Sequence, residues 1–222
     1  MKLLLTSGGV SNEALRAELV GLLGRPIEEA TAVCIPTAMY GHPYAGPGER
    51  VWEFVAGRSA QPMVDLGWRS VSLLELTALP SIGGERWREL VRLADALLVS
   101  GGDALYLAHW MRESGLLDLV PELGDTVWVG MSAGSMVLTP RIGPEFVGWE
   151  PPGGGDAALG LVDFCLFPHL DHPDLTENTR AAAEEWAAGL GHPAYGLDDD
   201  GAVVVDGDDV RVVSTGTWCR FG

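Results

Sequence analysis

Short apolar segments of strand length alternate with segments of helical spacing along most of this chain, and that alternation restricts the fold more than any other feature. The expected strands are residues 3–6, 32–36, 71–74, 96–99, 127–129 and 164–168. The expected helices are residues 12–23, with Ser11 as the N-cap, 49–56, 86–93, 104–113 and 176–188. Short buried strands that alternate with helices predict a parallel sheet covered on both faces.

The last part of the sequence changes pattern. Residues 202–205 and 210–213 flank a turn-forming stretch at 206–209, which predicts an antiparallel hairpin. We therefore expect a three-layer α/β/α domain with a mostly parallel sheet and this hairpin at one edge. A chain of 222 residues, 47% of them hydrophobic, is sufficient for one such domain over residues 1–222.

Charge and cysteine content restrict the partners and the compartment. A formal net charge of −17 argues against nucleic acid and against an anionic membrane surface, because both need a basic face. Three widely spaced cysteines form no disulfide framework, and the N-terminal apolar run is too short for a signal peptide. No segment has the length of a membrane span. We expect a cytoplasmic protein, as a monomer or a homodimer.

Chemistry-bearing residues follow several of the expected strands. Glycines at 8–9 and 101–102, Ser132 and His169 each come directly after an apolar run. In open parallel sheets, ligands bind outside the carboxyl ends of the strands. These residues are therefore expected to converge on one crevice, and the Pro- and Gly-rich segment 141–160 is a candidate loop over it.

The strongest motif is Gly130-x-Ser132-x-Gly134, which follows the apolar run at 127–129. A nucleophile elbow is a tight strand-to-helix turn, so its flanking residues must be small, and the serine projects from the bend. The pattern therefore indicates Ser132 as a nucleophile. The alternative is an ordinary turn in which Ser132 is only a helix N-cap.

The glycine loop at residues 100–103 is a candidate for stabilising an oxyanion. Glycines let a backbone N–H approach a substrate oxygen closely, and Gly102 lies within this loop. The N–H of Ala133, directly after Ser132, would be the second donor. The alternative is a plain turn in which Asp103 caps the next helix, and Asp103 can do this while the loop also binds the oxygen.

A serine nucleophile needs a base and a group that orients it. Among five histidines, His169 is best placed because it ends a strand, and His172 is its rival. The acidic run Asp198, Asp199 and Asp200 supplies candidates for the orienting carboxylate. A solvated acidic turn is the alternative for each of them.

Residues 169–174 also resemble a metal-ligand cluster, with two histidines and two aspartates. A metallohydrolase needs further converging ligands, which the sequence does not supply. We therefore expect neither a metal nor any other cofactor.

Taken together, four segments resemble the peptidase E family of α-aspartyl dipeptidases, which is related to the cyanophycinases. The segments are Ser100-Gly101-Gly102-Asp103, Gly130-Met131-Ser132-Ala133-Gly134, Pro168-His169 and Gly196-Leu197-Asp198-Asp199. The resemblance covers nearly the whole chain. It implies a flavodoxin-like fold similar to that of class I glutamine amidotransferases, and a serine–histidine–acid triad.

The resemblance also assigns roles to individual positions. The triad would be Ser132, His169 and Asp199, where the family typically has a glutamate, and Asp198 is the alternative acid. Gly102 and Ala133 match the oxyanion-hole positions. Arg180 is similar in position to an arginine that holds the side chain of an N-terminal aspartate.

The leading hypothesis is a serine exopeptidase that acts on short peptides, including dipeptides with N-terminal aspartate. A cyanophycinase-like hydrolase of β-aspartyl-arginine is the first alternative, since an acidic surface attracts an arginine-rich substrate. An esterase that uses another base such as His192, and a non-catalytic small-molecule binding domain of the same fold, are further alternatives.

Overall fold

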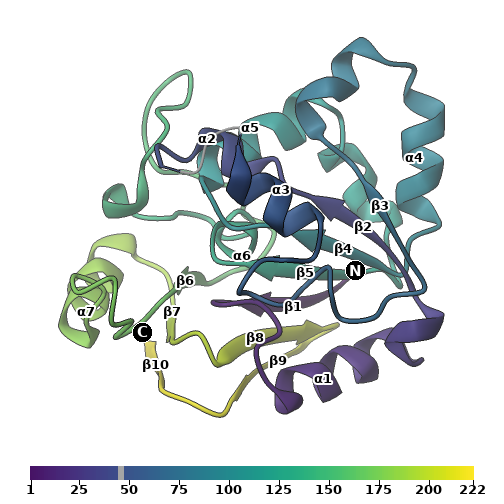
Figure 1. Ribbon diagram of the computed structural model, residues 1–222. Helices are drawn as coiled ribbons and strands as arrows, with labels where there is room; N and C mark the ends of the chain where they lie inside the picture. The colour runs from purple at the N-terminus through teal and green to yellow at the C-terminus, as the bar shows by residue number, and fades with distance from the viewer. Residues whose placement is uncertain (45–47) are drawn as a thin grey trace.

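The computed structural model describes residues 1–44 and 48–222, and it confirms the expected α/β fold (Figure 1). The main sheet has the strand order β3-β2-β4-β5-β1-β8-β9. Its strands are β1 (Lys2–Thr6), β2 (Thr31–Ile35), β3 (Ser70–Leu73), β4 (Ala96–Val99), β5 (Val127–Met131), β8 (Gly201–Asp206) and β9 (Asp209–Ser214). The strands from β3 to β1 pair in parallel, whereas β8 and β9 form the predicted antiparallel hairpin beside β1.

Helices lie between the strands, as the alternation predicts. They are α1 (Glu13–Leu23), α2 (Ala38–Gly41), α3 (Glu49–Val55), α4 (Gly84–Arg92), α5 (Ala104–Glu113), α6 (Ala133–Met136) and α7 (Arg180–Leu190). Short 3-10 helices occupy Ile27–Glu29, Leu76–Ser81, Leu117–Glu122 and Pro144–Phe146. Within the described part of the chain, every helix is too short or too polar to cross a bilayer.

Strands β1, β2, β4, β5 and β8 each contribute buried side chains to two separate cores. Leu3 and Leu5 pack in one cluster with Leu105 of α5, whereas Leu4 packs in the other with Leu15 and Leu19 of α1. Successive side chains of a strand point to opposite faces, so a continuously apolar strand needs cover on both sides. The helices provide that cover, which makes the domain three layers thick.

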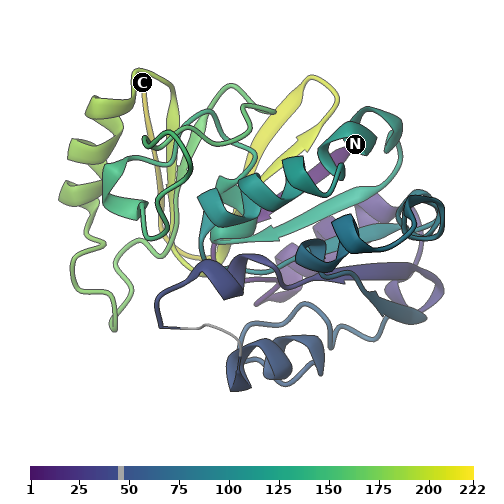
Figure 2. The ribbon, with the colours of Figure 1, turned by 90° about the horizontal axis from the view of Figure 1, so that it is seen from above.

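A second, smaller sheet lies beside the main one, with α7 packed against it. Its strands, in the order β10-β7-β6, are β6 (Cys165–Phe167), β7 (Ala194–Leu197) and β10 (Trp218–Phe221). Both ribbon views place this sheet and α7 on the side of the molecule away from α4 (Figures 1 and 2). The strand expected at 164–168 therefore forms, but in a sheet that the sequence pattern does not predict.

Two predicted helix starts are wrong for identifiable reasons. Asn12, not Ser11, caps α1, because its side chain accepts hydrogen bonds from the N–H groups of Ala14 and Leu15. The Ser11 hydroxyl instead donates to the backbone carbonyl of Asp199, at 2.9 Å. Helix α7 begins at Arg180 rather than at residue 176, because the chain before it forms turns.

Candidate active site

Ser132 lies on a sharp bend between β5 and α6, and its backbone has φ +50° and ψ −113°. A positive φ in a residue with a side chain costs on the order of 1–3 kcal/mol, so the surroundings must impose it. A side chain at Gly130 would overlap the backbone of Gly134, and one at Gly134 would overlap the carbonyl of Val99. Both glycines of the motif are therefore sterically required by this bend.

Buried hydrogen bonds hold the bend in place. The indole N–H of Trp128 donates to the carbonyl of Gly134 at 2.8 Å, and the hydroxyl of Ser135 donates to the carbonyl of Thr6 at 2.8 Å. The backbone N–H of Ser132 donates to the same Thr6 carbonyl at 3.0 Å. The end of β1 therefore holds the Ser132 bend in place through buried hydrogen-bonding groups.

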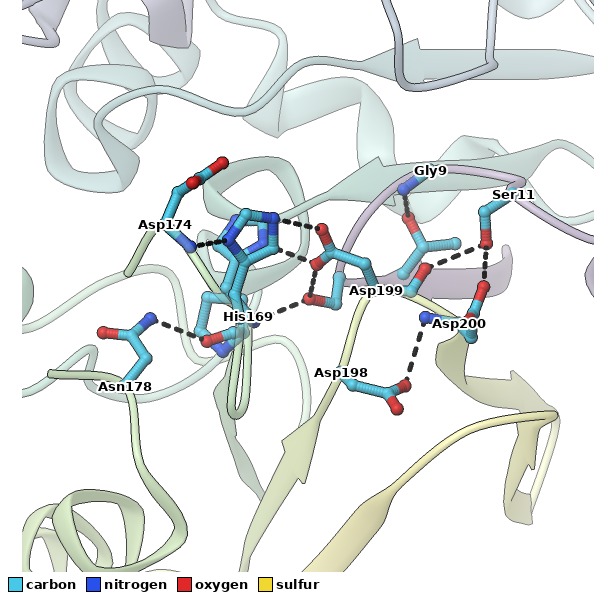
Figure 3. Close-up of polar contacts among 12 residues, drawn as sticks. Gly9, Ser11, His169, Asp174, Asn178, Asp198, Asp199 and Asp200 are labelled. Carbon is cyan, nitrogen blue, oxygen red and sulfur yellow. Dashed lines mark hydrogen bonds and ion pairs between the residues drawn. The ribbon is translucent and has the colours of Figure 1, made fainter. Parts of the chain in front are cut away.

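His169 follows β6 and faces Asp199, which follows β7 (Figure 3). The Nδ1 atom of His169 is 2.6 Å from Oδ1 of Asp199. The side chains are 22% and 30% exposed, so the pair lies at the edge of solvent rather than in the core. In such a pair the carboxylate fixes the tautomer and the orientation of the imidazole, which leaves Nε2 free to accept a proton.

Ser7 joins this pair to the main sheet. Its fully buried hydroxyl donates to Oδ1 of Asp199 at 2.9 Å and accepts the backbone N–H of His169 at 2.7 Å. Next to it, Gly8 leaves room for the carboxylate, because an added Cβ there would lie 2.6 Å from Cβ of Asp199. Ser7 was not predicted as a site residue from the sequence, although its position at a strand end, directly before two glycines, indicates a site residue.

His172 lies on the other side of the same carboxylate. Its Nε2 is 3.6 Å from Oδ2 of Asp199, and its Nδ1 accepts the backbone N–H of Asp174 at 3.1 Å. Because Nδ1 is an acceptor, the neutral ring carries its proton on Nε2, directed toward the carboxylate. In this tautomer neither ring nitrogen of His172 is available to take a proton from a serine.

Asp198 points away from both histidines. Its Oδ1 accepts the N–H of Asp200 at 3.1 Å, and its Oδ2 accepts the N–H of Thr217. These contacts close the turn after β7 and tie it to the chain before β10. Asp199 is thus the acidic residue that the structure brings to the imidazoles.

The surroundings of Asp199 favour its charged form. Burial acts to raise the pKa of this carboxyl, but the hydrogen bonds from His169 and Ser7 and the nearby imidazoles outweigh it, so the net pKa is lowered. Asp199 therefore remains ionised near neutral pH.

The glycine loop lies directly against the serine. An added Cβ at Gly101 would be 3.5 Å from Cβ of Ser132. Gly102 has a φ of +134°, and a side chain there would overlap the backbone of Ala38. Within residues 1–44 and 48–222, the N–H groups of Gly102 and Ala133 donate no hydrogen bond to the protein. Ala133 is the next residue after Ser132, and Gly102 follows the glycine that touches Ser132, so their role as oxyanion donors stays a prediction.

The serine and the histidine are linked through β1 rather than directly. In the part of the chain that the structure describes, no hydrogen bond joins Ser132 Oγ to His169. Thr6 contacts Ser132, and the adjacent Ser7 contacts His169 and Asp199. Catalytic hydrogen bonds are often long in unliganded enzymes and tighten when substrate binds.

Arg180 begins α7 and is exposed, and its backbone N–H donates to Oδ1 of Asp171 at 3.2 Å. Among the described residues, its guanidinium forms no ion pair with Asp199. Burial raises the pKa of Cys219 on β10, and the Arg180 charge acts against that rise. The substrate-binding role expected for Arg180 stays a prediction.

Residues 169–174, which resemble a metal-ligand cluster in the sequence, form local hydrogen bonds in the structure. Asp171 accepts the N–H of Arg180, and His172 accepts the N–H of Asp174. Among the described residues, no group of three or more histidine, cysteine or acidic side chains is arranged to hold a metal ion.

The loop at 141–160 is attached to the domain at both of its ends. At one end the guanidinium of Arg141 donates to the carbonyl of Gly189 at 3.3 Å, and at the other Arg112 donates to the carbonyl of Ala158 at 2.8 Å. In the middle of the loop, the N–H of Trp149 donates to Oδ2 of Asp103 at 2.6 Å. Asp103 also caps α5 by accepting the N–H of Tyr106 at 2.8 Å. Burial raises the pKa of Asp103, although its backbone hydrogen bonds act to lower it.

The fold and the bend at Ser132 define a class of α/β proteins with a serine on a sharp turn between a central strand and a helix. Within that class, the chain belongs to peptidase family S51, whose family model matches residues 3–213. The resemblance to peptidase E that the sequence motifs predict is thereby confirmed.

Individual relatives agree with this assignment. The chain is 29% identical to a protein named Peptidase E from a Nostoc species over 146 residues, which are 62% of this chain and 60% of that protein. It is 32% identical over 130 residues to a Drosophila melanogaster protein named "Probable alpha-aspartyl dipeptidase", covering 54% and 53% of the two chains. The matches thus span between about half and three fifths of these relatives.

A solved structure supports the fold over the full length. The structure of a peptidase from an acI-B1 actinobacterium covers 98% of this chain and 88% of its own, with a TM-score of 0.67 and 23% identity. At that identity the likeness establishes the architecture alone. The chain therefore belongs to peptidase family S51 and has the α/β architecture of that solved structure.

Proposed function

We propose that this protein is a serine exopeptidase that hydrolyses short peptides, dipeptides with N-terminal aspartate among them, through an acyl-enzyme on Ser132. Family membership supports peptide hydrolysis, and one relative is named as an α-aspartyl dipeptidase. The chemistry needs no cofactor.

One observation carries the proposal: the strained backbone of Ser132. Its φ of +50° occurs in a turn where both flanking glycines are sterically required. Strain of this kind persists where the fold over-determines it and is concentrated at functional sites. An N-cap serine needs no positive φ, and Ser132 forms no side-chain cap hydrogen bond in α6. The nucleophile interpretation therefore accounts for a cost that the N-cap alternative leaves without a function.

The first step is attack on the scissile carbonyl. Ser132 Oγ bonds to the carbonyl carbon while its proton passes to Nε2 of His169, and the carbonyl oxygen becomes negatively charged. The free N–H groups of Gly102 and Ala133 stabilise that oxygen. The C–N bond then breaks, and His169 returns the proton to the departing amine.

The second step regenerates the enzyme. Water loses a proton to His169, attacks the ester on Ser132 and releases the N-terminal product as Ser132 recovers its proton. Asp199 remains ionised and stabilises the protonated imidazole in both steps. Ser7 and His172 hold the carboxylate, so they act as positioning residues.

A dipeptide-hydrolysis screen on the wild type and on Ser132→Ala tests the proposal. We expect Ser132→Ala to lose about three to six orders of magnitude in kcat. His169→Gln should lose at least about a hundredfold, whereas His172→Gln should lose no more than about tenfold, since it removes only a distant partner of Asp199. A fluorophosphonate probe should label the wild type at Ser132. Full activity in Ser132→Ala, or equal losses in the two histidine variants, would reject these roles.

A cyanophycinase-like activity on β-aspartyl-arginine is the second candidate, and the net charge of −17 favours it. An acidic protein attracts an arginine-rich polymer over long range. Parallel turnover assays with Asp-Leu and β-Asp-Arg separate the two activities. A protein that turns over neither substrate and resists the probe would be a binding domain that retains the fold alone.

A further inference from the structure

The two edges of the main sheet are protected to different degrees. Among the described residues, β9 forms one edge, and its Arg211 pairs with Asp209 and Glu18. Strand β3 forms the other edge, beside α4 (Figure 1), and its sequence Ser-Val-Ser-Leu contains neither a charge nor a proline. An edge strand presents unpaired backbone groups to other chains, so native proteins cover it or place charges and prolines on it. β3 has none of these devices and is largely exposed.

Two residues of β3 direct their backbone groups away from the sheet. The N–H of Leu74, directly after the strand, donates to the carbonyl of Cys34 on β2 at 2.9 Å, as the parallel register of the two strands requires. Alternate residues of a strand direct their N–H and C=O groups to opposite sides. Ser72 therefore faces β2 as Leu74 does, whereas Val71 and Leu73 present their backbone N–H and C=O groups outward.

The side chains of the same two residues are exposed and adjoin an apolar groove. Val71 is 37% exposed and Leu73 is 54% exposed. Leu73 also lines a groove of about 840 Å³ that runs from the end of β3 to α4, and its other lining residues include Ile82, Trp87 and Leu90. A continuous exposed apolar surface, unlike a single exposed side chain, marks an interaction site.

The charge of this segment differs from that of the rest of the chain. Residues 66–93, which contain β3 and α4, have four arginines and three glutamates, so their formal charge is +1, while the rest of the chain carries −18. Two copies of so acidic a protein repel one another across most of their surfaces. The repulsion is weakest where this segment of one copy meets the same segment of another, which favours a second copy of the chain as the occupant of the β3 edge.

We propose that two copies of this chain pair through β3, in antiparallel register about a two-fold axis at Ser72, to form one continuous sheet. In that register Val71 of each copy lies opposite Leu73 of the other. Because both residues face outward, each such pair exchanges both of its backbone hydrogen bonds. A shift of two residues in either direction would match fewer outward residues of β3. A two-fold interface is self-complementary, so the same short strip supplies both sides of the contact.

Sedimentation velocity over a range of protein concentrations tests this pairing. We expect a species of twice the 23.6 kDa chain mass that dissociates on dilution. Val71→Pro removes an outward N–H without removing a hydrogen bond to β2, and Leu73→Lys places a charge on the edge. Each change acts twice in a symmetric dimer, so each should raise the dissociation constant by at least about tenfold.

Val210→Lys is the matched control for these substitutions. It adds the same charge at an exposed apolar position of β9, the other edge strand. A surface charge remote from the interface contributes little, so the dissociation constant should stay within about threefold of the wild-type value.

Ser72→Cys tests the register itself. Residues directly opposite one another in a non-hydrogen-bonded antiparallel pair have Cα atoms about 4.5 Å apart, which suits a disulfide. With oxidised glutathione as the oxidant, the two introduced thiols should lose two protons and two electrons to it and link the copies. The three native cysteines are buried and do not compete. Ser70→Cys is the control, because position 70 lies opposite Leu74 of the second copy and its own two thiols are too far apart.

Three results would overturn the proposal. A wild type that stays monomeric at every concentration removes the dimer, even if β3 pairs with some other protein. A dimer that neither Val71→Pro nor Leu73→Lys weakens has its interface elsewhere. A cross-link through Ser70→Cys but not through Ser72→Cys rejects the register. Circular dichroism of each variant verifies the fold, and if Val71→Pro does not fold, the other two β3 substitutions decide.

Discussion

The two halves of the candidate site are held by different kinds of force. Ser132 and the glycine loop belong to the main sheet, where backbone sterics and buried hydrogen bonds fix them. His169 and Asp199 follow strands of the small sheet and are held by side-chain hydrogen bonds at the edge of solvent. The comparison teaches that the nucleophile is positioned by shape, whereas its base is positioned by charge.

The two halves should consequently respond differently to pH. Near Ser132 the positioning groups are backbone amides, an indole and a hydroxyl, and none of these titrates between about pH 2 and pH 9. The Asp199 pKa is lowered in the folded protein from its ordinary 3.8. Its contribution to folding is thus present above pH 3.8 and is lost as the pH falls through the folded value.

The largest expected effect separates the two neighbouring aspartates. Asp199→Asn should lower kcat by about 10²- to 10⁴-fold, because the amide cannot stabilise the protonated His169 and favours the wrong tautomer. Asp198→Asn should keep kcat within about threefold and lower the unfolding free energy by about 0.5–1 kcal/mol, since it weakens only turn hydrogen bonds. Steady-state kinetics and thermal unfolding measure both. A larger kcat loss in Asp198→Asn would exchange their roles.

The same comparison explains which half could be predicted from the sequence. The bend at Ser132 is formed by residues within a few positions of one another, so the motif and its apolar strand predict it, although Thr6 and Val99 support it from distant positions. The contact of Asp199 with His169 joins positions 30 apart, and its contact with Ser7 joins positions 192 apart. No local pattern shows which member of an aspartate run turns toward an imidazole, so the choice between Asp198 and Asp199 needs the fold.

The main sheet could likewise be predicted from the sequence, whereas the small sheet could not. The strands of the parallel sheet are apolar on both faces, and their alternation with helices predicts their layers. The small sheet is built from short strands, and β10 at Trp218–Phe221 has no clear alternating pattern, so neither this strand nor the second sheet was predicted.

Ser7 is the joint between the halves, and its removal has the next largest expected effect. Ser7→Ala removes a donor to Asp199 and leaves the N–H of His169 without its acceptor. We expect kcat to fall about 10- to 100-fold with KM nearly constant, and the unfolding free energy to fall by about 1–3 kcal/mol. The Asp199 pKa should rise toward its ordinary value, so the loss of stability in acid should begin at a higher pH than in the wild type.

Ser11→Ala is the matched control for this substitution. The Ser11 hydroxyl also contacts the acidic turn, but it donates to the Asp199 backbone carbonyl and to Asp200, and it is exposed. Its loss should change kcat by no more than about twofold and leave the pH dependence of stability in place. If Ser11→Ala and Ser7→Ala lower kcat and shift the pH dependence of stability equally, the effect is one of turn stability, and Ser7 does not connect the halves.

The smallest effect concerns Asp103, which anchors the glycine loop on the main-sheet side. Its pKa is raised in the folded state, so its contribution to folding is complete below pH 3.8 and is lost as the pH rises through the folded value. Asp103→Asn removes the buried charge and keeps one acceptor oxygen, so it can serve Tyr106 or Trp149 but not both, and it should lower the unfolding free energy at pH 7 by about 0.5–1.5 kcal/mol.

Asp103→Ala should lower the unfolding free energy by about 0.5–2 kcal/mol, because α5 loses its cap and the N–H of Trp149 loses its acceptor. Denaturant unfolding at a series of pH values between about 3 and 8 measures this loss. Asp103→Asn should make the unfolding free energy less dependent on pH over that range. Since Asp103 does not touch His169 or Asp199, neither substitution should move the pH–rate profile. A shift there would show that the main-sheet half responds to charge as well as to shape, and the distinction between the two halves would fail.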